Sequence, residues 1–305
     1  MAETKRRDRD RHVGAAWRQA SALPIWNDPV MPSELQGGMS NVNFVVEDGG
    51  RKFVVRLCGD IEVHGIVRRN EVAVSRAAHA AGVAPRVVYS EPGVLVLDYI
   101  EGRTFTPVDV RAGENLSRIV ELARRTHREI PKHLRGPGII FWVFHVIRDY
   151  AHTLGEAATA NLAELRRLQA RAEELEQAVG PVELVFCHND LLAANLIDDG
   201  KRLWLIDWEY GGFNTPLFDL GGLASNSELP QELRDALLEM YFGRKPNDQL
   251  RYRFAAMTAA SLLRETMWSM VSEIHSRIDF DYSSYTAENF ARFEKAFAAF
   301  KAMQR

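Results

Sequence analysis

The chain has 305 residues, 46% of them hydrophobic and 26% charged, with a formal net charge of −3, which is the composition of a soluble globular protein. It has no clustered basic face, and its longest uninterrupted apolar stretch, residues 139–144, is too short to span a bilayer, so we expect neither nucleic-acid binding nor stable membrane insertion. The two cysteines, Cys58 and Cys187, lie in apolar runs without metal-ligand spacing and the first residues form no apolar leader, so we expect buried thiols and a cytoplasmic protein.

Residues 1–98 carry the pattern of a small sheet with one helix. Four apolar runs predict strands, at residues 42–46, 53–57, 86–89 and 94–97. A Gly-Gly turn separates the first two runs, which predicts a β-hairpin. Good helix formers occupy residues 70–81 and end at Gly82. We therefore predict a sheet-rich, nucleotide-binding N-lobe over residues 1–98.

From residue 99 onward the pattern becomes mainly helical. Helices are predicted at residues 113–129, 140–154, 160–179, 217–225, 230–242, 247–275 and 286–303. Short strands are predicted at residues 184–187, 194–198 and 203–206. We therefore predict a larger C-lobe over residues 99–305 and an α+β fold of two lobes, with a small-molecule site in the cleft between them.

The spacing His-x-Asp-x4-Asn that begins at His188 predicts a catalytic loop for phosphoryl transfer, which needs a carboxylate near the acceptor hydroxyl and metal ions on the phosphates. Asp190 is placed to accept the hydroxyl proton, and Asn195 can offer its amide oxygen to Mg²⁺. Asp207 follows an apolar strand and is expected to be the principal metal ligand, with Glu209 holding a second metal through water. A polar turn and a strand end would explain any one of these residues alone, but their joint spacing favours a kinase-type site.

Residues that bind ATP are predicted in the N-lobe. A glycine-rich turn opens the first hairpin, and its amides and polar side chains are expected to contact phosphate: Gly37, Gly38, Ser40, Asn41 and Asn43. Arg56 ends the second strand and is expected on the ATP phosphates, with Glu71 as its ion-pair partner and Arg68 on the same face of the helix. The segment around Tyr99 is the expected hinge, where backbone groups would bind adenine.

The catalytic segment resembles the choline/ethanolamine kinase family, within the aminoglycoside-phosphotransferase-like superfamily, in the residues HNDLLAANLI and LIDWEYGGFNTPLFDLGG. GGMSNVNF, FVVRL and MWSMVSEIHSRIDFDYSSY extend the resemblance over roughly residues 34–300. It implies a protein-kinase-like fold that uses ATP and Mg²⁺ to phosphorylate a small amino alcohol. By motif match Asp190 is the base, Asn195 and Asp207 are metal ligands, and Asp219 braces the catalytic loop. The family has arginine where protein kinases have lysine in the third strand, and Arg56 matches it.

The acceptor pocket is expected downstream of the catalytic loop. A quaternary ammonium is held by aromatic faces with acids nearby, and the candidate aromatic residues are Tyr210, Trp268, Phe280, Tyr282 and Tyr285. Eukaryotic-type members of the family carry a further tryptophan where this chain has Glu265, and an acid where it has Asn226. A carboxylate accepts hydrogen bonds from a primary ammonium, so ethanolamine is an expected acceptor beside choline.

Two alternatives stay open at this point. One is a kinase of another small hydroxylated amine, of the aminoglycoside or thiamine type, although the aromatic segment favours neither. The other is a catalytically silent ligand-binding member, which the presence of Asp190, Asn195 and Asp207 disfavours. The sequence leaves the oligomeric state open, and a homodimer is compatible with it.

Overall fold

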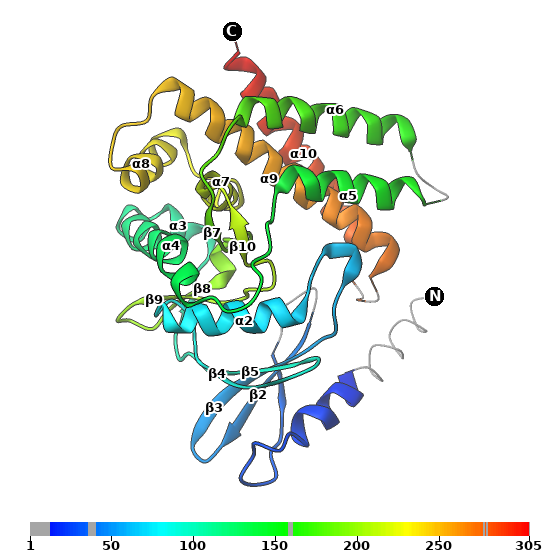
Figure 1. The fold of residues 1–305 in the computed structure, drawn as a ribbon, viewed down its shortest axis with the longest axis vertical. Coiled ribbons are helices and arrows are strands. Elements are labelled where there is room, and N and C mark those ends of the chain that lie inside the picture. The colour runs from blue at the N-terminus through cyan, green and yellow to red at the C-terminus, as the bar shows by residue number, and fades with distance from the viewer. Residues whose placement is uncertain (1–12, 36–40, 158–160, 277, 279, 305) are drawn as a thin grey trace.

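The computed structural model describes residues 13–35, 41–157, 161–276, 278 and 280–304. A small sheet with two helices beside it, over residues 13–21 and 68–80, forms one lobe, and a larger group of helices forms the other (Figure 1). This arrangement confirms the predicted α+β fold of two lobes. Within the described residues, no helix is both long enough and apolar enough to cross a membrane.

The smaller lobe is built on an antiparallel sheet whose strand order is β1-β2-β3-β5-β4. Its strands are β1 Ser33–Leu35, β2 Val42–Asp48, β3 Arg51–Leu57, β4 Val87–Glu91 and β5 Val94–Asp98. The tight turn between β2 and β3 needs positive φ angles, which Gly49 and Gly50 adopt at 56° and 72°. Alternate residues of the hairpin, such as Phe44 and Val55, are buried with residues of the helix over 13–21. The predicted hairpin and both later strands are confirmed.

Helix α2, Arg68–Ala80, lies between the sheet and the helical lobe (Figure 1). Its buried side chains, including Val74, Ala77 and Ala78, belong to the large hydrophobic core of the helical lobe rather than to the core of the sheet. This packing holds Glu71, on the same helix, at the boundary between the lobes. The lobe boundary at residue 98 stays a prediction, because α2 precedes that residue and yet packs into the larger core.

Long helices form most of the larger lobe. They are α3 Pro107–Arg111, α4 Gly113–His133, α5 Val143–Gly155, α6 Leu162–Val179, α7 Pro216–Asn226, α8 Gln231–Phe242, α9 Asp248–His275 and α10 Tyr282–Ala302. Helix α9 is central and packs against α5, α6, α7 and α10 (Figure 1). The predicted long helices are confirmed, whereas α3 and the helix over 13–21 were not predicted.

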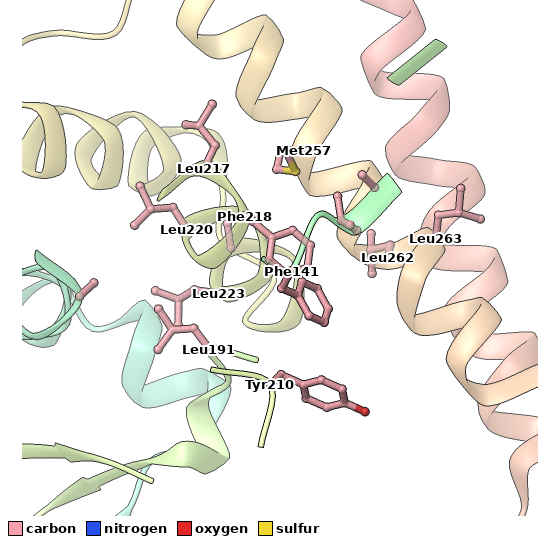
Figure 2. Packing of buried hydrophobic residues seen from close by; sticks show 14 of the residues in the cluster. Phe141, Leu191, Tyr210, Leu217, Phe218, Leu220, Leu223, Met257, Leu262 and Leu263 are labelled. Carbon is pink, nitrogen blue, oxygen red and sulfur yellow. The ribbon is translucent and has the colours of Figure 1, made fainter. Parts of the chain in front are cut away.

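Helix α7 approaches α9 closely because it presents glycine at the contact. A Cβ atom on Gly221 would lie 3.2 Å from the backbone nitrogen of Thr258 in α9. Phe218 of α7 and Met257 and Leu262 of α9 are buried in the surrounding core (Figure 2). The tight packing fixes α7, and with it the acidic residue of its first turn, beneath the catalytic segment.

Short strands frame that segment. They are β6 Arg103–Thr104, β7 Val185–Cys187, β8 Leu196–Asp198, β9 Leu203–Leu205 and β10 Gly212–Asn214, paired as β10-β7 and β6-β8-β9. A single-turn helix, Ala193–Asn195, precedes β8. The three predicted short strands are confirmed. The prediction of two buried thiols is half wrong, because Cys187 is buried but Cys58 is partly exposed.

Candidate active site

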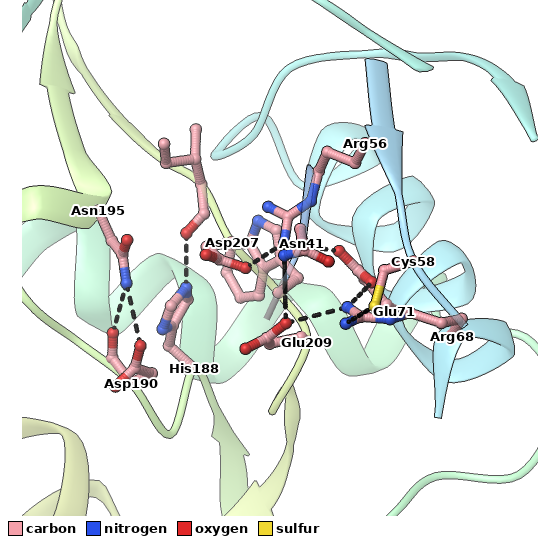
Figure 3. A network of polar contacts seen from close by, with 12 residues as sticks. Asn41, Arg56, Cys58, Arg68, Glu71, His188, Asp190, Asn195, Asp207 and Glu209 are labelled. Carbon is pink, nitrogen blue, oxygen red and sulfur yellow. Dashed lines mark hydrogen bonds and ion pairs between the residues drawn. The ribbon is translucent and has the colours of Figure 1, made fainter. Parts of the chain in front are cut away.

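The catalytic loop follows directly from strand β7. Asn189 has a positive φ of 64°, and its side-chain amide donates to the carbonyl oxygens of Tyr210 at 2.9 Å and Gly212 at 3.2 Å. The side-chain amide of Asn195 donates to the backbone oxygen of Asp190 at 2.9 Å and to its Oδ2 at 3.3 Å (Figure 3). These contacts close the loop on itself and fix the Asp190 carboxyl relative to Asn195.

Asp219, in the first turn of α7, binds the backbone at the start of this loop. Its carboxylate accepts hydrogen bonds from the backbone N–H groups of His188 and Asn189, both at 2.8 Å. His127 of α4 places its Nε2 3.0 Å from the same carboxylate and its Nδ1 2.7 Å from the hydroxyl of Tyr241. Burial raises the pKa of Asp219, but the hydrogen bond and charge of His127 and the contacts with His188 outweigh it, so the net pKa is lowered. A buried carboxylate with these donors is well suited to fix a loop.

Asp207 lies just beyond strand β9, with a positive φ of 68°. The backbone N–H of Ile206 donates to the carbonyl oxygen of Asn195 at 3.0 Å, which places Asp207 beside Asn195. The Asp207 carboxylate accepts a 2.6 Å hydrogen bond from Arg56 of strand β3 (Figure 3). Asn195 and Asp207, both predicted as metal ligands, therefore lie together where the lobes meet.

Arg56 and Arg68 join three carboxylates in one buried network (Figure 3). Arg56 lies 3.2 Å from Glu71, and Arg68 lies 2.7 Å from Glu71 and 2.9 Å from Glu209. Burial lowers the pKa of Arg56, but the charges of Asp207, Glu71 and Glu209 raise it more. The net pKa is raised, so the Arg56 guanidinium stays charged within the network. Two guanidinium groups against three carboxylates leave a formal charge of −1 in this network.

The remaining residues predicted to bind ATP are placed only in part. Asn41 donates to Glu209 at 3.5 Å, and Asn43 lies opposite Arg56 in the β2–β3 ladder. The backbone N–H of Tyr99 donates to the carbonyl oxygen of Lys52 at 3.1 Å, so this N–H is already used. Gly37, Gly38 and Ser40 lie outside the described residues.

Two hollows flank the catalytic loop. The first, of about 230 Å³ including space open to solvent, lies between the lobes and is lined by Arg56, Glu71, Leu97, Asp207 and Trp208 among others. The second, of about 280 Å³ on the same measure, is lined by Asp190, Asn226, Ser261, Arg264 and Glu265 among others. Asp190 and Asp207 thus face different spaces on either side of one loop.

The environment of Asp190 favours its protonated form in the ligand-free protein. Burial among protein atoms raises the pKa of Asp190 to about 8, against the charge of Arg264, and the carboxylates of Glu265, Asp207 and Glu209 contribute to the rise. The side chain is nevertheless part-exposed at the second hollow. A carboxyl whose charged form is this sensitive to its neighbours is typical of a functional site.

The aromatic side chains predicted for the acceptor pocket form one cluster beside this hollow. Trp268 donates from Nε1 to the hydroxyl of Tyr210 at 3.1 Å and lies edge-on to Tyr282, with ring centres 6.1 Å apart. Phe280 lies 5.0 Å from Tyr282 and 5.6 Å from Tyr285 between ring centres. Tyr285 in turn donates its hydroxyl proton to Glu265 at 2.7 Å.

Three of these aromatic side chains, Tyr210, Trp268 and Tyr282, are buried in the protein itself, whereas Phe280 is 43% exposed. His64 stacks on Trp268 with ring centres 5.1 Å apart, and the guanidinium of Arg264 lies 4.4 Å above the ring of Tyr210. Among the described residues that line the 280 Å³ hollow, the predicted substrate residues present are Asn226 and Glu265, not the five aromatic residues. Contact of the five aromatic side chains with the acceptor therefore stays a prediction.

Comparison with known proteins supplies the family. The family model described as choline/ethanolamine kinase matches residues 33–227, which include β1 through α7 and thus the whole catalytic loop. The chain belongs to the choline/ethanolamine kinase family. The resemblance inferred from the sequence is confirmed.

Two curated relatives differ in their sequence identity to this chain and in the share of its length that they match. Protein LicA of Haemophilus influenzae is 31% identical over 216 residues, which is 69% of this chain and 62% of that protein. The match therefore spans less than two thirds of that relative's length. Ethanolamine kinase 2 of Mus musculus is 25% identical over 305 residues, which is 89% of this chain and 78% of that protein.

A crystal structure of a choline/ethanolamine kinase family protein from Mesorhizobium loti shares the fold. The two chains superpose with a TM-score of 0.75 and are 28% identical, and the match covers 95% of this chain and 98% of the other. The resemblance thus extends through both lobes.

Three residues of the site were not predicted from the sequence: His64, His127 and Arg264. His127 lies in α4, and no motif connects it with the catalytic loop that it supports through Asp219. Arg264 immediately precedes Glu265, which departs from the family pattern. This neighbouring departure was the one sign in the sequence that Arg264 could belong to the site. His64 belongs to a single turn, Glu62–His64, without periodicity.

Proposed function

We propose that the protein transfers the γ-phosphate of ATP to the hydroxyl of a small amino alcohol, with ethanolamine and choline as the reference acceptors. The observation that supports this most is the position of the two aspartates. Asp190 lines the hollow beneath the loop, and Asp207 lines the hollow between the lobes beside Arg56. A carboxylate on the acceptor side and a carboxylate on the phosphate side are what an in-line phosphoryl transfer requires.

The donor set at the phosphate side fits Mg²⁺. Asp207 and Asn195 offer hard carboxylate and amide oxygens, Glu209 stands two residues further on, and the surrounding network has an excess of one negative charge. Bound Mg²⁺ would neutralise charge on the transferring phosphoryl group. Arg56 lies 3.2 Å from Glu71 and lines the hollow between the lobes, where it would bind the ATP phosphates.

At the acceptor side, Asp190 would accept the proton of the hydroxyl and orient it for attack. Glu265 is expected to hold the ammonium group of the acceptor, because Tyr285 and Arg264 fix its carboxylate at 2.7 and 2.9 Å. Asn226 is itself held by Arg292 at 3.0 Å and would contribute to the wall of the pocket. With His64 and Arg264 on the aromatic faces, we expect a primary ammonium to be preferred over a quaternary one. The expected location is the cytoplasm, where ATP is supplied.

The experiment is a panel of hydroxylated amines with ATP and Mg²⁺, followed by ADP release. Ethanolamine, choline, thiamine and an aminoglycoside cover the proposal and its alternatives. Acceptor-dependent ADP release with ethanolamine or choline supports the proposal. Release with thiamine or the aminoglycoside alone, or with none of the amines, would exclude it. The Glu265→Gln variant should raise KM for ethanolamine more than for choline, with exposed Glu288 on α10 mutated to Gln as the matched control.

A further inference from the structure

Arg264 is a buried cation in the proposed acceptor pocket, where one of its nitrogens holds Glu265 and the proposed reaction assigns no task to the other two. It lies on the central helix α9, is only 4% exposed, and lines the same hollow as Asp190. Its Nη1 donates to Glu265 at 2.9 Å, and its guanidinium lies 4.4 Å from the ring centre of Tyr210. A charge buried this deeply normally has all its donors paired.

Two donors of Arg264 are not paired. Nε and Nη2 are buried and have no hydrogen-bond partner among the described residues. These two N–H groups point from the same edge of the planar guanidinium, and together they form the fork that binds two oxygens of a carboxylate or phosphate. The cation–π contact with Tyr210 is made by the face of the guanidinium, so it does not involve the N–H groups on this edge.

We propose that Arg264 is an oxyanion-binding residue of the acceptor pocket. This inference rests on the proposed function, because the pocket is defined by Asp190 as the acceptor-side carboxylate. The oxyanion has two sources: a carboxylate carried by the acceptor, or the phosphate ester formed on the acceptor hydroxyl. Both present the paired oxygens that a two-donor guanidinium edge recognises.

The neighbouring carboxylate of Glu265 makes the site suitable for a zwitterion. Glu265 offers an acceptor for an ammonium group, and Arg264 offers donors for an oxyanion directly beside it. An amino alcohol that also carries a carboxylate on the carbon next to nitrogen has this arrangement of charges. Arg264 also occupies the ring face of Tyr210 that a quaternary ammonium would need, which disfavours choline.

The test uses the full chain with Mg-ATP and matched pairs of acceptors. Serine is ethanolamine with an added carboxylate, and homoserine is 3-aminopropanol with the same addition. The variants are Arg264→Lys, which keeps the charge and loses the fork, and Arg264→Gln. The control is Arg251→Lys on the same helix, where the arginine pairs with Asp235 at the surface. Thermal unfolding verifies that each variant is folded.

Two results would support the proposal and distinguish the sources. If the acceptor carries the oxyanion, serine or homoserine has a lower KM than its uncarboxylated partner in the wild type. Arg264→Lys then raises KM for the carboxylated acceptor roughly tenfold more than KM for the uncarboxylated partner, which changes only through the weaker contact with Glu265. If the phosphate ester is the ligand, O-phosphoethanolamine inhibits the wild type, and Arg264→Lys raises its Ki roughly tenfold more than it raises KM for any of the acceptors.

The proposal is overturned if ethanolamine is phosphorylated and yet no carboxylated acceptor, O-phosphoethanolamine or inorganic phosphate competes with it in the wild type. This measurement does not depend on the folding of any variant. It also separates the inference from the proposed function, which fails only if none of the small amino alcohols supports ADP release.

Discussion

The carboxylate of Asp207 lies 2.6 Å from the guanidinium of Arg56, so the expected metal ligand and the expected phosphate-binding cation are paired with each other. Both side chains also face the hollow between the lobes. In the proposed reaction, binding of Mg-ATP would therefore exchange this internal ion pair for contacts of Asp207 with metal and of Arg56 with phosphate. Loss of Arg56 should therefore change the affinity for a free divalent cation and the affinity for Mg-ATP in opposite directions.

Arg56→Gln should weaken binding of Mg-ATP and strengthen binding of a divalent cation in the absence of nucleotide, because Arg56 competes with the cation for Asp207. We expect each effect to be about tenfold, as for the loss of one charge-assisted contact. Titration with Mn²⁺, followed by electron paramagnetic resonance, measures the cation, and calorimetry measures the nucleotide. An unchanged or weaker Mn²⁺ affinity in the variant would contradict the competition.

Asp190→Asn should lower kcat by at least about 100-fold and leave the affinity for Mg-ATP nearly unchanged, because Asp190 faces the acceptor hollow. Steady-state kinetics with the preferred amine and calorimetry with Mg-ATP check the two parts. Near-normal turnover in the variant would show that another group takes the proton.

Asp207→Asn should impair both turnover and Mg-ATP binding, because this carboxylate lies on the phosphate side of the loop. Removal of divalent cations with EDTA should abolish activity, and added Mg²⁺ should restore it. If Asp207→Asn keeps wild-type affinity for Mg-ATP, the metal is held elsewhere.

Asp219→Asn should lower both the stability of the protein and its kcat. The variant loses a carboxylate oxygen that serves the backbone of His188 and the ring of His127, and we expect about 2 kcal/mol lower free energy of unfolding. Urea unfolding measures this loss. Asp235→Asn, which removes a surface pair with Arg251, is the control and should cost less than about 1 kcal/mol. Equal losses in the two variants would argue against a special role for Asp219.

His64 makes the stability depend on pH. Burial lowers the pKa of His64 to about 3, and the charges of Arg264 and His275 act in the same direction. Its nitrogens lie 3.3 Å from the hydroxyl of Tyr150 and 3.0 Å from that of Ser272.

In the unfolded chain His64 has a pKa near 6.5, so between that value and 3 the unfolded state binds the extra proton. The stability is therefore fully present above about pH 6.5 and falls by about 1.4 kcal/mol per pH unit below it. Relative to His64→Gln, the wild type should lose about 2 kcal/mol between pH 7.5 and pH 5 in urea unfolding. Parallel pH profiles of the two proteins would show that His64 is not responsible.

The catalytic loop could be predicted from the sequence because its parts are close together in the chain. Asp190, Asn195 and Asp207 fall within one loop and one hairpin, whose local spacing determines where they lie. Helices and strands with a clear periodicity were also predictable. Strands β1, β6 and β10 were not, because none of them contains the apolar run by which the other short strands were recognised.

The acceptor pocket could be predicted only in part, because tertiary packing determines which side of α9 reaches it. Helix α9 is buried along most of its length, so its sequence shows no single apolar face from which the side facing the cavity could be read. The sequence indicated Glu265 through its departure from the family pattern, but it gave no sign that Arg264 would cover Tyr210. In the same way, His64 reaches Trp268 from a turn 204 positions earlier in the chain, and only the packed structure reveals the contact.

The packing of α2 has a consequence for how the cleft closes. Because Val74 and Ala77 are embedded in the core of the helical lobe, we expect α2 to move with that lobe, while the sheet moves as a separate body. Arg56 is on the sheet and Glu71 is on α2, so the distance between their side chains, 3.2 Å in this structure, should change as the cleft between the lobes opens or closes. A pair of spectroscopic probes on β3 and α2 would therefore follow the opening and closing of the whole cleft from within a short stretch of the chain.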